Sequence, residues 1–278
     1  MAAIIGSKVI YIIHDLCYEY SVTDNKVTRI INYELSCPDH EEADTKIAFL
    51  ACQQKENSTV TIRTSDTDIL VIMLANMEHL QATVEIWMDL GIGNARRYID
   101  VSALYNKLGP KISKALPGLH AFTGCDFNPA LYRRGKKKPL QFLMTSETFQ
   151  NAFLDLGSKE HNVQDSFHII QSFTCHLYGL KKLSDVNQAR IVIFNKTYKV
   201  KDKFQPFSLS IRNYDACNLP PCQSELFQQV LRTRFIACLW SNAYKANIID
   251  LLPTDYGWRV VDGKYEMIWF AGDQLPKA

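Results

Sequence analysis

The chain has 278 residues, of which 47% are hydrophobic and 22% are charged, and its net charge is only +2. This composition is ordinary for a globular protein, and the small net charge excludes a strong overall attraction to nucleic acid, so any such binding must depend on a local basic patch. No apolar run approaches the roughly 20 residues that a transmembrane helix needs, so no membrane partner is expected.

The N-terminal segment and the cysteines predict an intracellular protein. The segment Met1–Asp15 is typical of a strand and lacks the basic start and small-residue cleavage site of a signal peptide. The eight cysteines form no CxxC pair, which indicates reduced and mostly buried thiols. Cys217 and Cys222 come closest to a metal-ligand spacing, but no histidine or second pair lies nearby, which disfavours zinc.

The first half of the chain alternates predicted strands and helices. Strands are expected at Val9–His14, Val27–Tyr33, Val60–Thr64, Val84–Met88 and Tyr98–Val101, and helices at Glu41–Gln54, Ile69–Asn76, Ser102–Leu108, Ile112–Leu116 and Leu119–Phe122. At the first helix, Asp39 is the expected N-cap and Glu42 its capping-box partner. This alternation predicts an α/β layer with a mostly parallel sheet flanked by helices.

The second half of the chain is predicted to be mainly helical. Helices are expected at Thr148–Leu156, Ser166–Tyr178 and Ser224–Tyr244. The tail alternates apolar and polar residues on both sides of Asp262-Gly263, which predicts a β-hairpin. We therefore expect an α/β core over residues 1–145 and a helical extension over residues 146–278 that ends in the hairpin.

Five carboxylates form three short clusters, each beside an apolar stretch. They are Glu42 and Asp44 in HEEADTKIA, Asp66 and Asp68 in RTSDTDILVI, and Asp126 in HAFTGCDFNPA. Carboxylates are costly to bring together near a core unless a positive group lies between them, and Mg²⁺ prefers oxygen ligands. Asp66 and Asp68 come directly after a strand, where ligands of open α/β sheets bind. The clusters therefore predict a divalent-metal site.

Other placements of these acids stay open. Gly124 permits a tight turn that could bring Asp126 back toward the strand ends. On a regular helix Glu41, rather than Glu42, would share a face with Asp44, so either glutamate is a candidate ligand. Acidic residues at strand ends and helix starts are also common as caps that accept backbone N–H groups, which is the competing interpretation of each cluster.

A basic turn follows the last acidic cluster. It consists of Arg133, Arg134, Gly135, Lys136, Lys137 and Lys138. A glycine turn that enters a helix offers backbone N–H groups to a phosphate, and the basic side chains add positive charge. The turn is therefore a predicted nucleic-acid contact, with a solvated loop or a nuclear localisation signal as the alternatives.

The order EEAD, SDTD, GCD and then a glycine-and-lysine turn resembles flap endonucleases of the PIN-like nuclease superfamily, over residues 39–144. The strings HEEADTKI, SDTDILVI and GLHAFTGCDF are similar to those of a group of mobile-element-associated animal proteins. The resemblance implies a PIN-like fold, a nuclear location, and Mg²⁺- or Mn²⁺-dependent hydrolysis of nucleic acid, DNA more than RNA, at branched or single-stranded junctions. It implies a metal site that can hold two ions and in which Asp66, Asp68 and Asp126 are catalytic. The implied metal ligands are Glu42, Asp44, Asp66, Asp68 and Asp126, and the implied DNA contacts are Gly135, Lys136 and Lys137.

The chain also departs from that family. Flap endonucleases carry aspartates on earlier strands, whereas only forty residues precede Glu41 here and Asp15 is the sole acid near the end of an early strand. The basic turn has one glycine where the family has two. These departures leave open an N-terminally truncated chain and a degenerate copy. The alternative function is a catalytically inactive module that binds nucleic acid or protein. A third possible function is that of another enzyme with a DxD motif, such as a phosphatase or sugar-nucleotide transferase.

Overall fold

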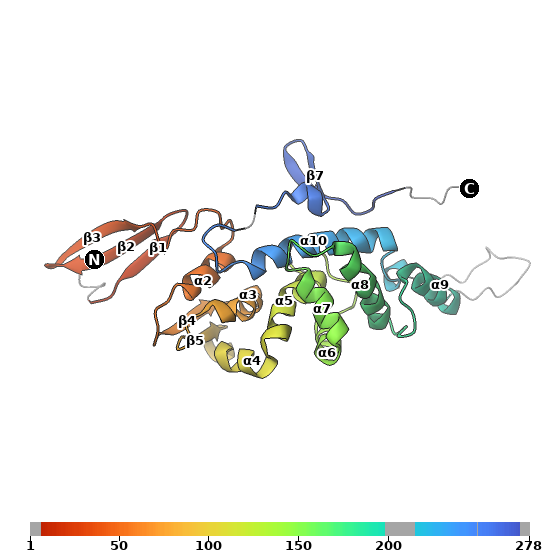
Figure 1. The fold of residues 1–278 in the computed structure, drawn as a ribbon, viewed down its shortest axis with the longest axis horizontal. Helices are drawn as coiled ribbons and strands as arrows, with labels where there is room; N and C mark the ends of the chain where they lie inside the picture. The colour runs from red at the N-terminus through yellow and green to blue at the C-terminus, as the bar shows by residue number, and fades with distance from the viewer. Residues whose placement is uncertain (1–6, 198–214, 249, 273–278) are drawn as a thin grey trace, which may run out of the picture. The chain divides into compact units, whose positions relative to one another are not determined.

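The computed structural model describes residues 7–197, 215–248 and 250–272, whose helices and strands are shown in Figure 1. The chain divides into two compact units: unit 1 is Met1–Lys114 with Leu239–Asp250, and unit 2 is Ala115–Cys238 with Leu251–Ala278. Helices and small sheets make a mixed α/β structure, as predicted. Among the described residues, no helix is both long and apolar enough to cross a bilayer. The predicted boundary near residue 145 stays a prediction.

Unit 1 contains a three-stranded mixed sheet. Its strands are β4 (Thr59–Thr64), β5 (Glu85–Leu90) and β6 (Arg97–Asp100), and β5 pairs parallel with β4 but antiparallel with β6. The antiparallel edge follows from the short connection between β5 and β6, which is too short for the crossover that a parallel pair needs. The sheet is therefore mixed rather than mostly parallel, and among its strands only the β4–β5 pair has the parallel pairing that the sequence predicts.

Helices α2 (Ala43–Cys52), α3 (Asp68–Asn76) and α4 (Val101–Leu108) lie beside this sheet in Figure 1. Almost every residue of α3 is buried, which explains its continuous apolar sequence DILVIMLAN. Short 3₁₀ turns, η1 (Met77–His79) and η2 (Gly93–Ala95), follow α3 and β5. The order of strand and helix predicted from the sequence is confirmed for this part of the chain.

The start of α2 differs from the sequence prediction. Glu42, not Asp39, is the N-cap residue, and its side chain makes no capping hydrogen bond. The backbone N–H of His40 instead donates to the carbonyl of Cys37 at 3.2 Å, which forms a tight turn ahead of the helix. The capping box is therefore wrong, because the buried His40 fixes the chain in a different conformation before the helix begins.

An antiparallel meander precedes α2. Its strands are β1 (Ile10–Ile13), β2 (Cys17–Thr23) and β3 (Lys26–Asn32), in the order β1-β2-β3. Asp24 and Asn25 both have positive φ, 51° and 59°, as a two-residue hairpin turn of type I′ requires. The predicted turn and the outer strands are confirmed, whereas β2 was not expected because its sequence CYEYSVT mixes polar and apolar residues.

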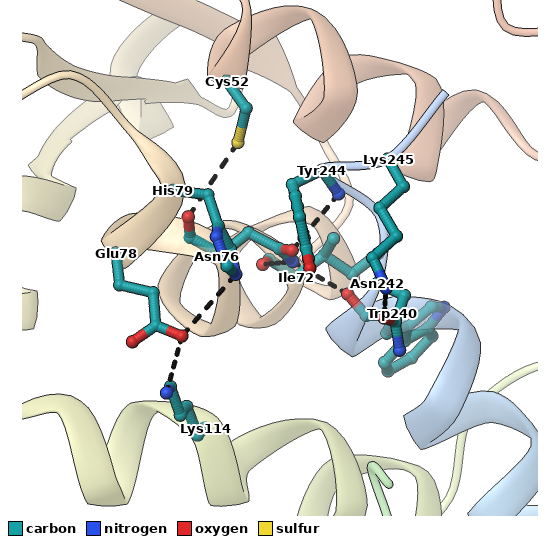
Figure 2. Close-up of polar contacts among 10 residues, drawn as sticks. All are labelled: Cys52, Ile72, Asn76, Glu78, His79, Lys114, Trp240, Asn242, Tyr244 and Lys245. Carbon is teal, nitrogen blue, oxygen red and sulfur yellow. Dashed lines mark hydrogen bonds and ion pairs between the residues drawn. The ribbon is translucent and has the colours of Figure 1, made fainter. Parts of the chain in front are cut away.

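The segment Leu239–Asp250 is held against α3 and η1 within unit 1, as Figure 2 shows. The fully buried Asn76 donates from Nδ2 to the carbonyls of Ile72 and Trp240, both at 2.8 Å. Its Oδ1 accepts the backbone N–H of Tyr244 at 3.3 Å. The ring of His79 stacks on Tyr244 with a centroid distance of 3.5 Å. These contacts make the late segment a structural part of unit 1.

The lowered pKa values of two histidines in unit 1 predict that the free energy of unfolding falls in mild acid. Burial lowers the pKa of both His40 and His79 below the ordinary 6.5, and around His79 Glu78 opposes this shift while Lys114 and Lys245 add to it. Around His40, the hydrogen bond to the carbonyl of Lys245 and the charge of Asp39 oppose the shift, whereas the charge of Lys46 adds to it. The unfolded chain then binds more protons, so this contribution to the free energy of unfolding is complete above about pH 6.5 and is lost as the pH falls.

Urea unfolding at about pH 7.5 and about pH 5.5 measures this loss. The double variant His40→Gln/His79→Gln is expected to show a smaller difference between the two pH values than the wild type. Replacement of the exposed His14 by glutamine is the control and should leave the difference unchanged. A wild-type protein with the same unfolding free energy at both pH values would contradict the prediction.

Unit 2 is mainly helical. Its helices are α6 (Lys137–Thr145), α7 (Glu147–Asp155), α8 (Val163–Leu177), α9 (Val186–Thr197) and most of α10 (Gln223–Ser241), with the 3₁₀ turns η4 (Ala216–Asn218) and η5 (Pro253–Tyr256). Helices α6, α7 and α8 lie side by side in Figure 1. Phenylalanine rings from α5 (Pro110–Phe122), α6, α7 and α8 form the centre of the core. The three helices predicted in this half are confirmed.

Helix α5 (Pro110–Phe122) and the C-terminal hairpin complete the fold. The sequence predicts two short helices where α5 is continuous through Pro117 and Gly118. A Cβ atom on Gly118 would lie 2.4 Å from the carbonyl oxygen of Phe153, so the glycine allows close packing rather than ending the helix. Strands β7 (Trp258–Val261) and β8 (Lys264–Met267) confirm the predicted hairpin around Asp262-Gly263.

Candidate functional site

The loop after β4 carries Asp66 and Asp68. Asp66 is exposed, its backbone N–H donates to Thr64 Oγ1 at 2.9 Å, and its Oδ1 accepts the backbone N–H of Asp68 at 2.8 Å. Asp68 is half-buried and is the first residue of α3. One oxygen of Asp66 therefore stabilises the entry into α3, as in the competing interpretation of this cluster, while the carboxylate itself faces solvent.

Glu42 and Asp44 lie at the start of α2 in the same unit and are both half-buried, whereas Glu41 is exposed. Across the part of the chain that the structure describes, no group of three or more His, Cys, Asp and Glu side chains is arranged to hold a metal ion. Carboxylates remain the right ligand type for Mg²⁺ or Mn²⁺. The predicted metal site thus stays a prediction.

Asp126 lies in unit 2, at the tip of a tight turn after α5. Cys125 and Asn128 exchange backbone hydrogen bonds of 3.0 and 3.1 Å, which leaves Asp126 exposed between them. Gly124 has a φ of 118°, and a Cβ atom there would lie only 2.8 Å from the Cβ of Ala130. Only glycine fits this position, so the G of the GCD motif has a structural role.

Asn128 anchors this turn, and the sequence analysis missed it. Its side chain is 1% exposed, and Nδ2 donates to the carbonyls of Ala121 and Gln229 and to Thr233 Oγ1, at 2.9 to 3.2 Å. Its Oδ1 accepts Arg232 Nε at 3.2 Å. The sequence does contain a signal for such an anchor, since the polar residues QQ and RTR interrupt the apolar part of α10. Polar residues that are buried need hydrogen-bond partners elsewhere in the fold.

The basic turn leads into α6. The guanidinium of Arg134 lies 4.3 Å from the ring centre of Tyr178, and that of Arg133 lies 5.0 Å from the ring of Tyr132. Burial raises the pKa of Tyr178, and the charge of Arg134 partly opposes this shift. Each guanidinium group therefore lies within cation–π distance of an aromatic ring.

Lys136 connects the basic turn to the GCD turn. Its ammonium group donates to the carbonyl oxygens of His120 at 3.1 Å and Gly124 at 2.5 Å. Gly135 and Lys137 are exposed, and Lys138 lies 5.7 Å from the ring of Phe142. The structure thus brings together two motifs that the sequence presented separately.

A groove of about 440 Å³ lies between these two turns. It is lined by Thr123, Gly124, Cys125, Asn128, Pro129, Ala130, Arg134, Gly135 and Lys136. Asp126 is not among these residues, but its neighbour Cys125 is. Comparisons of the chain with protein-family models, with curated proteins and with solved structures find no match.

Proposed function

We propose that the protein binds nucleic acid along its phosphate backbone and, in a PIN-like fold, hydrolyses phosphodiester bonds with Mg²⁺ or Mn²⁺. The observation that carries the proposal is the contact between the basic turn and the GCD turn, which lie on either side of one groove in unit 2. Positive side chains held on a helix N-terminus suit repeated phosphates, and their local concentration compensates for the small net charge of the chain.

The exposed end of β4 supports the hydrolytic part of the proposal. Asp66 and Asp68 follow the carboxyl end of the parallel strand pair, where α/β proteins place their ligands. When bound, a divalent ion would supply the positive charge that stabilises phosphoryl oxygens during hydrolysis. Glu42, Asp44 and Asp126 remain the further candidate ligands on the strength of the sequence pattern.

One observation favours a second function, a binding module without hydrolysis. Asp66 accepts the N–H of Asp68 in the manner of a cap, which gives this carboxylate a structural role that needs no metal ion. A protein of this kind would keep the basic turn and its affinity for phosphates. The two functions therefore differ in metal-dependent cleavage and agree in binding.

A cleavage assay separates these functions. Labelled flap, hairpin and linear DNA and matched RNA are incubated with wild type or Asp66→Asn, in Mn²⁺ or in a chelator. Asp24→Asn, purified in the same way, is a matched control, because Asp24 lies in the β2–β3 turn and asparagine tolerates its positive φ. We expect Mn²⁺-dependent cleavage by the wild type and the control and its loss in Asp66→Asn, with binding unchanged.

Binding is measured on the same substrates at two salt concentrations. Lys137→Glu should weaken binding and reduce its salt dependence, whereas Lys264→Glu, at the exposed start of β8, should not. Binding without cleavage would leave the second function. Cleavage that persists equally in Asp66→Asn would come from a contaminant or another site, and absence of both binding and cleavage would overturn the proposal.

A further inference from the structure

The groove beside the basic turn is too large for a phosphate group alone. Its volume of about 440 Å³ lies in the range of roughly 300–1,000 Å³ that small organic ligands occupy. Pro129, Ala130 and the two glycines give it small and mainly apolar walls, and Arg134 places a cation at the same site. Such a groove suits a flat apolar group that carries a negative charge.

Gly135 lines this groove although the fold does not require a glycine there. Its φ is outside the left-handed region, and a Cβ atom on it would meet no other atom within 4 Å. Gly124 is the contrast, because its φ of 118° and its contact with Ala130 exclude any side chain. Packing therefore does not explain the glycine at this position of the lining, and a larger side chain there can be introduced without a clash in the fold.

We infer that the groove receives one unpaired nucleotide, with its base against the Pro129–Ala130 wall and its phosphate toward the basic turn. This inference rests on the proposed nucleic-acid binding and names the part of the substrate that occupies the groove. Bases that leave a helix bind in single-strand sites by contact with apolar and planar groups, including arginine. The Arg134 guanidinium, held over Tyr178, is a planar cation of this kind.

The polar side chains of the groove are engaged in the fold rather than directed to a base. Thr123 Oγ1 donates to the carbonyl of Leu119 at 2.8 Å, and the Asn128 amide bonds to α5 and α10. Recognition of a particular base requires hydrogen bonds to its edge. We therefore expect the groove to bind the four nucleotides with comparable affinity.

The test uses the full chain with Gly135→Ala and Gly135→Leu, and Gln141→Leu as a control on the exposed side of α6. One arm titrates each of the four nucleoside 5′-monophosphates by calorimetry. The other arm measures binding of a duplex with one unpaired 2-aminopurine, by its fluorescence, and of the fully paired duplex. Gly135→Leu should weaken monophosphate binding about tenfold or more, as expected for one lost base contact, and remove the preference for the unpaired duplex. Gly135→Ala should have a smaller effect and the control none.

The two arms separate this inference from the proposed function. If Gly135→Leu binds monophosphates and the unpaired duplex as well as the wild type does, the nucleotide groove is overturned, whatever the affinity for paired DNA. If monophosphate binding depends on Gly135 but no duplex binds, the groove stands and the proposed function fails. Arg134→Lys, which keeps the charge but removes the planar group, gives the same readout should Gly135→Leu not fold; unchanged binding there would overturn the groove.

Discussion

Replacement of Phe173 by alanine is expected to lower the free energy of unfolding by about 3–5 kcal/mol. Phe173 is 0% exposed and lies at the centre of the aromatic core of unit 2. Its ring centre is 4.9 Å from that of Phe153 and 5.0 Å from that of Phe149, with near-perpendicular planes. Truncation removes these edge-to-face contacts and leaves a cavity that the surrounding helices cannot fill.

Chemical unfolding followed by circular dichroism measures this loss, and hydrogen exchange in α7 and α8 assigns it to unit 2. Phe173→Leu is the matched control and should cost about 1–2 kcal/mol, because most of the buried volume is kept. The ordinary cost of a point mutation is about 1 kcal/mol. A smaller loss for the alanine variant would show that the core is not closely packed around Phe173.

Replacement of Arg232 by methionine is expected to cost about 2–3 kcal/mol, although methionine is the more apolar residue. Arg232 is 1% exposed, and burial lowers the pKa of its guanidinium to about 10. It donates to Asn128 Oδ1 at 3.2 Å and to the carbonyl of Ile268 at 2.7 Å. Methionine would remove the cation but leave these acceptors buried without a donor, which costs more than the arginine's own desolvation.

The matched control is Arg259→Met, because Arg259 pairs with Glu266 at 3.1 Å on the hairpin surface and is 64% exposed. Exposed pairs of this kind contribute about 0–1 kcal/mol. A double-mutant cycle between Arg232→Met and Asn128→Ala should give a coupling energy of at least about 0.5 kcal/mol. Additive effects, or a stabilised Arg232→Met protein, would contradict the structural role of this pair.

The elements that the sequence predicts correctly are those whose signal is local. The turns at Asp24-Asn25 and Asp262-Gly263 have residues that tolerate positive φ, and α3 is a continuous apolar run bounded by polar residues. Strand β2 lacks a clear period, and α5 contains Pro117 and Gly118, which usually end helices. There the tertiary packing outweighed the local preference, and only the structure could reveal it.

The candidate site likewise combines motifs with a local signal and contacts that have none. The basic turn and the GCD motif are recognisable in the sequence because their residue types are unusual. Their contact depends on an ammonium group that meets the carbonyls of His120 and Gly124, and any residue could supply those carbonyls. The Asn128–Arg232 hydrogen bond joins positions 104 residues apart and likewise leaves no local pattern.

The discontinuity of unit 1 in the sequence has a consequence for folding during synthesis on the ribosome. Asn76 needs the carbonyl of Trp240 and the N–H of Tyr244, which are made 164 and 168 residues later. The nascent N-terminal part therefore emerges before these two hydrogen-bond partners of Asn76 exist, while the whole stretch from Ala115 to Cys238 is synthesised. Completion of unit 1 thus waits until this intervening stretch has been made, a delay during which chaperones can act.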